Sequence, residues 1–311
     1  MRSIHSLPAA LLALSSFAMA GTTLQPAEDS NCSHPFASAR RPISNPTLFD
    51  LALPTTNIHP IFLHHRLPNV LRPGLPVGGD VQLYALQFEI ALNERLSIVA
   101  TKDGYVEMNP DTTLSGDSGF ANLGAGLKYA FILDPDSGMA VSGSATVELP
   151  TGNSGVFQGE GDGLINLMVN GLKLHEQWQF AGTVGLQAPL DNEQAMNSWV
   201  SAHASYEVSS WFIPLVEVNW FHVLDAGNGT GNYPSQVGGA VPAVIPFEGG
   251  DLFNLGAVGA GNNRDFVTAA FGFRSRINEQ VDIGVAYEMP LTDDDGSLMK
   301  DRVTVDLVWK F

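Results

Sequence analysis

Two sets of residues in this chain carry side chains that could do chemistry. His203 lies two residues from both Ser201 and Ser205, so in a strand all three side chains point to one face. A base within hydrogen-bond reach of a serine is what nucleophilic catalysis needs. No G-x-S-x-G motif and no P-loop accompanies the trio. We therefore expect no enzyme and no catalytic residue.

The second set holds possible metal ligands, namely four histidines and an acidic run. The histidines are His34, His59, His64 and His65. Their spacing is not that of metal ligands, and the side chains of His64 and His65 would point to opposite faces of a strand. The run Asp293–Gly296 lacks the alternating ligands and the closing glutamate of a calcium loop. The sequence predicts no metal site and no cofactor.

Composition narrows the class of protein. Of 311 residues, 44% are hydrophobic and only 15% are charged, and 32 acids oppose 15 basic residues. Nucleic acid is excluded as a partner because no basic surface exists to neutralise phosphates. Beyond the N-terminus the sequence has no run of 18 apolar residues, so it predicts no membrane-spanning helix.

The first 20 residues are typical of a secretory signal. Arg2 is followed by an apolar stretch, and Ala18-Met19-Ala20 has the small-x-small pattern that precedes cleavage after Ala20. A buried N-terminal helix is the alternative. The single cysteine, Cys32, allows no internal disulfide.

The last strand alternates an apolar and a polar face. Val303, Val305, Leu307, Trp309 and Phe311 share one face, and Arg302, Thr304, Asp306 and Lys310 share the other. The run resembles the terminal strand of bacterial outer-membrane barrels. That resemblance implies that Trp309 and Phe311 form a membrane-insertion signal, read by the barrel-assembly machinery with the help of periplasmic chaperones.

Similar alternation recurs upstream in segments of about 10 to 14 residues, the length of a tilted membrane-spanning strand. Long connections are predicted at 67–79, 108–118, 150–162, 189–196, 225–263 and 291–300. Short turns are predicted at 93–94, 134–138, 175–176, 209–210 and 278–279. The pattern predicts an all-β fold, a closed antiparallel up-and-down transmembrane β-barrel of about 12 strands, with 10 or 14 as alternatives. The first strand, at about 56–66, is the weakest because Pro60 lacks a ladder donor.

This alternation places the protein in the outer membrane of a Gram-negative bacterium, in contact with its lipid and lipopolysaccharide. Aromatic residues support the placement, since they fall on the apolar face at the periplasmic ends of strands, as interfacial girdles do; they are Tyr129, Phe131, Trp178, Tyr206, Phe212 and Trp309. Aromatic residues in the core of a soluble sandwich are the alternative.

The polar faces would line the lumen. The predicted lining residues are Gln87, Glu89, Asn122, Lys128, Glu148, Asn166, Asn170, Gln179, His203, Glu217, Asn219, Arg274, Arg276, Asp282, Glu288 and Asp306. Twelve strands enclose a space between a filled eight-strand barrel and an open porin, so a narrow pore or a ligand-sized cavity is expected. The alternative is a lumen closed by its own salt bridges, pairing Lys128 or Arg274 with Glu217 or Glu288.

Three segments complete the organisation: a signal at 1–20, a proline-rich stretch at 21–54 and a barrel at 55–311. The stretch 21–54 either enters the lumen as a plug or remains in the periplasm. The extracellular segment 225–263 is long for a simple loop, and such loops often carry function. We expect it to fold into or over the barrel mouth as a constriction or a substrate lid, with a flexible surface loop as the alternative.

Over residues 55–311 the chain resembles uncharacterised outer-membrane barrels grouped with transporters of hydrophobic or aromatic compounds, such as the phenol-degradation-associated type. The runs that carry this resemblance are Ala85–Glu89, Leu92–Ser97, Lys102–Tyr105, Gly119–Leu123, Tyr287–Leu291 and the last strand. The resemblance implies passive uptake of small solutes. A non-conducting structural or surface-interaction protein is the alternative, and an outer-membrane lipid hydrolase is a distant third.

Overall fold

The computed structural model describes residues 36–72, 74–229, 232–242 and 248–311. The predicted signal peptide, residues 1–20, lies outside the described residues. So do residues 21–35 of the proline-rich stretch and residues 243–247 of the predicted lid.

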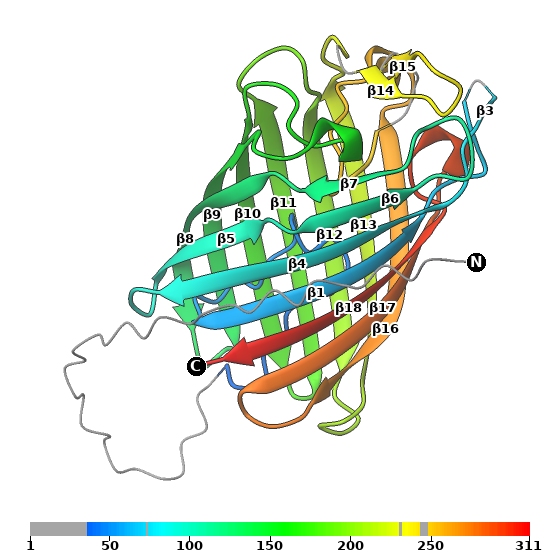
Figure 1. The fold of residues 1–311 in the computed structure, drawn as a ribbon. Coiled ribbons are helices and arrows are strands. Elements are labelled where there is room, and N and C mark those ends of the chain that lie inside the picture. Colours follow the sequence, from blue (N-terminus) through cyan, green and yellow to red (C-terminus); the bar gives the residue numbers. More distant parts are fainter. Residues whose placement is uncertain (1–35, 73, 230–231, 243–247) are drawn as a thin grey trace, which may run out of the picture. The chain divides into compact units, whose positions relative to one another are not determined.

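Antiparallel strands form a closed barrel (Figure 1). Among the described residues fourteen strands belong to one sheet. Two of them extend others across short breaks: β6 (Tyr105–Asn109) continues β5 along β4, and β7 (Asp117–Phe120) pairs with β6 and leads into β8. With each extension counted as part of its neighbour, twelve strands form the ring: β1 (Asn57–Arg66), β4 (Asp80–Ala91), β5 (Leu96–Lys102), β8 (Leu123–Asp134), β9 (Met139–Leu149), β10 (Leu164–His175), β11 (Trp178–Pro189), β12 (Met196–Tyr206), β13 (Ile213–Asp225), β16 (Asp265–Arg276), β17 (Val281–Pro290) and β18 (Asp301–Lys310). Closure is made by β1, which pairs with β4 on one edge and with β18 on the other. The predicted twelve-stranded barrel is confirmed.

Each wall strand buries alternate side chains, as β12 illustrates. Trp199, Ser201 and His203 are buried inside the ring, whereas Val200 and Ala202 are exposed outside it. Because side chains alternate in a strand, a sequence with one apolar and one polar face has an oily exterior and a polar interior. No soluble β-sandwich has this arrangement, since its apolar faces point inward.

The two ends of the barrel differ (Figure 1). Short turns gather at the end where β18 finishes, which we call the turn end. The opposite loop end carries the longer connections, including the hairpins β2 (Val70–Leu71) with β3 (Leu75–Pro76) and β14 (Asn232–Pro234) with β15 (Ala240–Pro242). Three short 3₁₀ helices also lie in these connections: η1 (Ser154–Val156), η2 (Val258–Asn262) and η3 (Asp294–Gly296).

The wall between β4 and β8 departs from the prediction. The predicted loop at 108–118 is partly strand, because β6 continues to Asn109 and β7 begins at Asp117. The strand is interrupted at Gly104, whose φ is +122° and where an added Cβ would lie 2.7 Å from the Tyr84 carbonyl oxygen. The Asp103 carboxylate accepts a hydrogen bond from Leu86 N at 2.9 Å, so a side chain replaces the ladder where β4 passes from β5 to β6.

Pro60 occupies the irregular position that its missing N–H demands. It is paired with Leu86 of β4, whereas the pairing of β1 with β18 is interrupted at His59 and Pro60. The rest of β1 pairs on both edges, so the predicted first strand is present.

The loop end contains the largest apolar cluster. It joins inward side chains of β1, β4 and β6, such as Leu63, Val81 and Met108, to loop residues such as Leu252 and Phe253. No helix within the described residues has the length and apolar character needed to cross a membrane.

We predict that Val218→Arg destabilises the barrel by about 2–4 kcal/mol, the cost of an arginine on the lipid face near the bilayer midplane. Val218 lies near the centre of β13, and its side chain is exposed on the outer face. The free energy of unfolding in lipid vesicles, followed by tryptophan fluorescence, measures this cost. Val237→Arg, in an exposed loop, is the matched control and should change little; equal effects at both sites would contradict a lipid-facing β13.

Candidate functional site: the barrel lumen

The structure places the predicted lining residues on the inner side of the ring. All but one of them are buried: Gln87, Glu89, Asn122, Lys128, Glu148, Asn166, Asn170, Gln179, His203, Glu217, Asn219, Arg274, Asp282, Glu288 and Asp306. Arg276 is less deeply placed, with 20% of its side chain exposed near the turn end. Asn122 lies just before β8, and the others lie on wall strands.

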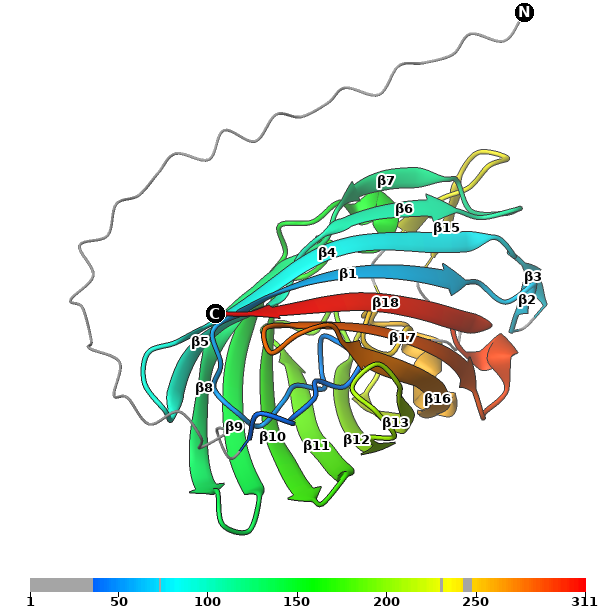
Figure 2. The same cartoon turned by 90° about the horizontal axis from the view of Figure 1, so that it is seen from below.

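The lumen is occupied by residues 36–54, which we call the plug segment. In the view from below the dark-blue segment runs inside the ring of strands (Figure 2). Its residues from Ile43 to Asn45 and from Leu48 to Leu53 are buried. The described part of the proline-rich stretch therefore enters the lumen, which decides between the two alternatives for this part.

Buried ion pairs tie the plug segment to the wall. Lys128 Nζ lies 2.9 Å from an Asp50 oxygen of the plug segment and 2.8 Å from a Glu89 oxygen of β4. Asp50 also pairs with Arg41. At the turn end, Arg40 Nη1 lies 2.9 Å from Glu207, which also pairs with Arg276 at 3.0 Å.

The structure contains salt bridges inside the lumen, but the predicted partners of Lys128 and Arg274 are wrong. Lys128 pairs with Glu89 and Asp50, and Arg274 Nη2 lies 2.8 Å from Asp306. Neither cation pairs with Glu217 or Glu288 in the way expected. Instead Glu288 lies 3.5 Å from Arg302, because register in the sheet, which strand patterning alone does not fix, decides which inward residues meet.

Glu217 is held by His203. His203 Nδ1 lies 2.7 Å from a Glu217 oxygen, and its Nε2 lies 2.9 Å from Ser205 Oγ. The serine–histidine contact that catalysis requires is present, but all three side chains are buried and Ser205 Oγ also accepts from Arg40 Nε at 3.2 Å. Neighbouring side chains therefore engage both the imidazole and the serine hydroxyl, and the group positions the Glu217 carboxylate.

The other histidines also have structural partners. His59 contacts Gln87 at 3.1 Å and Asp306 at 2.8 Å, and His65 Nε2 lies 2.7 Å from the Leu298 carbonyl oxygen. His34 lies outside the described residues. The described residues contain no group of three or more histidine, cysteine or acidic side chains placed to hold a metal ion. In the acidic run, Asp293 and Asp295 pair with Arg72.

Several wall strands carry buried polar atoms that have no hydrogen-bond partner among the described residues. Ser142 Oγ, Thr146 Oγ1, Asn170 Oδ1 and Thr183 Oγ1 are buried on β9, β10 and β11 without a hydrogen-bond partner among the described residues. An unsatisfied buried polar atom costs about 1–3 kcal/mol. The closed arrangement therefore leaves free energy that water or a polar solute could recover.

The described part of segment 225–263 closes the loop end. Leu252, Phe253, Leu255 and Ala257 are buried in the apolar cluster. Asp251 lies 2.8 Å from Arg302 Nη2 of β18, which anchors the segment to the wall. These residues pack against the wall, whereas Val237 and Val258 are exposed.

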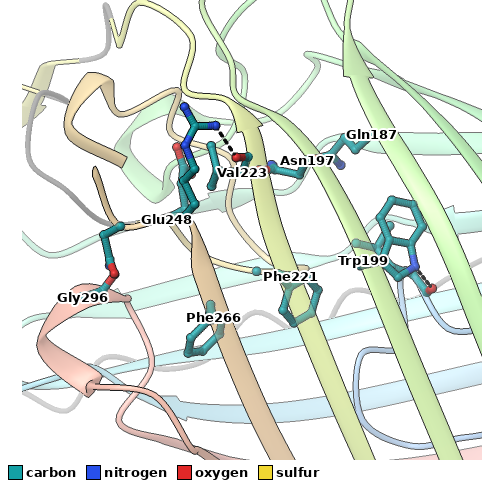
Figure 3. A pocket seen from close by; sticks show the side chains of 12 residues that line it. Gln187, Asn197, Trp199, Phe221, Val223, Glu248, Phe266 and Gly296 are labelled. Atoms are coloured by element: carbon teal, nitrogen blue, oxygen red, sulfur yellow. Dashed lines mark hydrogen bonds between the residues drawn. The ribbon is translucent and has the colours of Figure 1, made fainter. Parts of the chain in front are cut away.

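Two cavities near the plug segment and the loop-end segment are small. The cavity in Figure 3, lined by Leu48, Trp199, Phe221, Glu248 and Phe266 among others, has a volume of about 20 Å³. A second cavity, lined by Pro46, Leu83, Gln87, Lys102 and Leu252 among others, also has about 20 Å³. Each holds about one water molecule, so neither is large enough for a solute.

Sequence reasoning missed several residues of this site. Arg40, Arg41 and Asp50 lie in the plug segment, and Arg302 lies on the polar face of the last strand but not in the predicted lining. The signal for the plug segment was its composition: Ile43, Leu48, Phe49, Leu51 and Leu53 are apolar, which is unusual for a chain in free solution.

The site and fold define a transmembrane β-barrel of the outer-membrane type. Among solved structures, the chain is similar to the COG4313 outer membrane channel from Pseudomonas putida F1, with 14% sequence identity and a TM-score of 0.56, over 83% of this chain and 96% of that chain. It also matches the NanC porin at 7% identity and a TM-score of 0.49, over 82% of this chain and 100% of that chain. The translocator domain of the autotransporter NalP from Neisseria meningitidis matches at 10% identity and a TM-score of 0.48, over 84% and 90% of the two chains.

At 14% identity the similarity to the Pseudomonas channel shows a shared fold. No protein-family model and no curated protein matches the sequence.

We predict that Lys128→Met lowers the free energy of unfolding by about 3 kcal/mol or more, because Glu89 and Asp50 would lose a buried cation. Denaturant titration of protein refolded into vesicles measures the loss. Lys173→Met, which removes an exposed lysine bonded to the Ser137 carbonyl oxygen, should change the value by no more than about 0.5 kcal/mol. If Lys128→Met lowers the free energy of unfolding no more than Lys173→Met does, the buried ion pairs of Lys128 add no net stability.

Glu248 makes the lid sensitive to pH. Its carboxyl group accepts hydrogen bonds from Leu255 N and Ala257 N, each at 2.9 Å. Burial raises the pKa of Glu248 from 4.5 to about 7, although the backbone donors oppose the rise. The packed lid then binds more protons than the opened lid between these two values, so its stability falls as pH rises from about 4.5 to about 7 and is constant above.

We predict that Glu248→Gln removes this pH dependence, which spans about 3 kcal/mol. Amide hydrogen exchange at Leu255 and Ala257, corrected for intrinsic exchange rates, reports the opening free energy between pH 4.5 and 8. Glu279→Gln, in the turn between β16 and β17, serves as the control and should retain the wild-type slope. A slope that survives in Glu248→Gln would assign the pH response to another group.

Proposed function

We propose that the protein is an outer-membrane channel for the passive uptake of small solutes, closed in this structure by the plug segment. The observation that carries the proposal is that charges of the wall are neutralised by a segment that is not part of the wall. Lys128 binds Asp50, and Glu207 binds Arg40. A barrel with only a structural role could fill its interior with apolar side chains from its own strands, as small barrels do.

The incomplete hydrogen bonding of β9, β10 and β11 supports the same conclusion. Release of the plug segment would expose Ser142, Thr146, Asn170 and Thr183 to water and satisfy them. This gain offsets part of the loss of the ion pairs with the plug segment. The closed and open states can then lie within a few kcal/mol of each other, as a gated channel requires.

The class of solute is part of the proposal. The resemblance noted from the sequence implies small hydrophobic or aromatic solutes, and the apolar cluster at the loop end is the feature that supports it. The centre of the lumen is polar, with Gln87, Asn170, Gln179 and Asn219 among its lining side chains. A solute that crosses the whole lumen therefore has to form hydrogen bonds.

The same proposal covers export, location and partners. The protein would lose residues 1–20 during export and insert into the outer membrane of a Gram-negative bacterium, in contact with lipid and lipopolysaccharide. Exposed outer aromatic residues support this location, among them Trp178, Phe212 and Trp309. Trp309 and Phe311 are exposed at the end of the chain, where the barrel-assembly machinery and periplasmic chaperones could bind them.

A sealed barrel with a structural or surface-interaction role is the second candidate. It is favoured by the buried pair of Arg302 with Asp251, which joins the wall to the loop-end segment, and by the small size of the two lumenal cavities. Such a protein would bind partners at its surface and pass no ions.

Planar-bilayer recordings of the full chain and of a variant lacking residues 36–54 distinguish the two. We expect brief openings from the full chain and steady conductance from the deletion variant, because the deletion removes the segment that fills the lumen. Heat-dependent migration in gel electrophoresis checks that both proteins are folded. A folded deletion variant that conducts no more than the bare bilayer would establish the sealed barrel instead.

A further inference from the structure

The wall holds the plug segment largely by its main chain. The Gln179 side chain on β11 binds both main-chain groups of Arg40, accepting from its N–H at 2.7 Å and donating to its carbonyl oxygen at 2.6 Å. The two Glu217 oxygens on β13 accept from Ile43 N at 3.0 Å and from Ser44 N at 2.6 Å. Between them, Arg274 Nη2 on β16 donates to the Arg41 carbonyl oxygen at 2.9 Å.

Further along the plug segment the wall binds carbonyl oxygens. The Gln87 side chain donates to the Pro46 carbonyl oxygen at 3.0 Å. The Trp199 indole N–H donates to the Leu48 carbonyl oxygen at 2.7 Å, and Lys128 Nζ donates to the Leu51 carbonyl oxygen at 3.0 Å. The donor side chains lie on β4, β12 and β8. Main-chain recognition therefore comes from several strands around the ring.

These contacts do not depend on the identity of the plug side chains. Any peptide offers the same N–H and C=O groups, and main-chain hydrogen bonds supply affinity in other modes of peptide recognition while pockets supply specificity. One side-chain contact also selects for an apolar residue, since Ile43 packs against Leu215 and Ala286. The Arg40 side chain bonds to Glu207, which favours a basic residue at that position.

Contacts within the wall also hold Glu217 in place. His203 Nδ1 lies 2.7 Å from one of its oxygens, and His203 Nε2 is in turn bonded to Ser205. These contacts are made within the wall, on β12 and β13. They fix the carboxylate in the orientation that accepts two consecutive main-chain N–H groups.

We propose that Gln179, Glu217 and Arg274 form a binding tract for short extended peptides, for which the plug segment is the intramolecular competitor. This inference rests on the proposed channel function and names peptides as a solute class for it. A peptide that enters the lumen replaces the main-chain contacts of Arg40 to Ser44 one for one.

The test uses the full chain with Ile43→Pro and Ser44→Pro, which removes both N–H donors to Glu217 and so weakens the plug without altering the wall. The probe is a fluorescent synthetic peptide of residues 36–54, with binding followed by anisotropy in detergent micelles. We expect saturable binding to the variant. The same peptide carrying N-methyl groups at residues 43 and 44 should bind at least about tenfold more weakly, because two hydrogen bonds to a carboxylate are lost.

Competitors test the ligand class. Acetylated and amidated penta-alanine, which offers main chain with minimal side chains, should displace the probe, and maltopentaose should not. Adding Gln179→Leu to the variant should weaken binding of the probe at least about tenfold, because the amide pair with Arg40 is removed. The matched control is Gln187→Leu, another buried lumenal amide, which bonds to Asn166, Asn197 and Asn254 rather than to the plug segment.

Three results would overturn the tract: no binding of the probe, equal binding of its N-methylated form, or displacement by maltopentaose as effective as by penta-alanine. If the double-proline variant migrates as unfolded protein, the variant that lacks residues 36–54 is used instead. We expect the same order of affinities, with the unmodified probe binding more tightly than its N-methylated form. Conductance of the same preparation separates the two ideas. A barrel that conducts but binds no peptide would support the channel and contradict the binding tract. A barrel that binds peptide but does not conduct would support the tract and contradict the channel.

Discussion

A strand that crosses hydrocarbon must find a partner for every N–H and C=O on both of its edges, because lipid offers none. In this chain the requirement is met by β1, which pairs with β4 and with β18 and so joins the first and last wall strands. Every other feature follows from that closure. The ring has an outside that contacts lipid and an inside that does not, and alternate side chains of each strand are assigned to one or the other.

Closure creates a second problem inside the ring. Twelve strands bring charged residues such as Lys128, Glu217, Arg274 and Asp306 into a small volume, where an unpaired charge is costly. The plug segment and the lid supply many of the missing partners. The Asp50 carboxylate reaches Lys128, the main chain at Ile43 reaches Glu217, and Asp251 reaches Arg302.

The pairing of the wall is interrupted where β4 passes from β5 to β6. There the ladder is completed by the Asp103 side chain, and loop residues cover the remaining edge, with Asn153 N donating to the Phe120 carbonyl oxygen at 3.0 Å. The interior, by contrast, is tied together by side chains from many strands. The fold therefore combines a ring set by main-chain hydrogen bonds with an interior whose contacts are made by wall side chains.

The sequence alone determined the barrel, because the period-2 pattern and the alternation of short and long connections are local properties that each strand displays independently. It also indicated which residues face inward, such as Gln179 on β11 and Asn170 on β10. Only the tertiary structure decided that residues 36–54 enter the lumen, that Lys128 meets Asp50 and Glu89, and that His203 orients Glu217. Those contacts join residues far apart in the chain, and their partners depend on sheet register and ring closure, which no local pattern encodes.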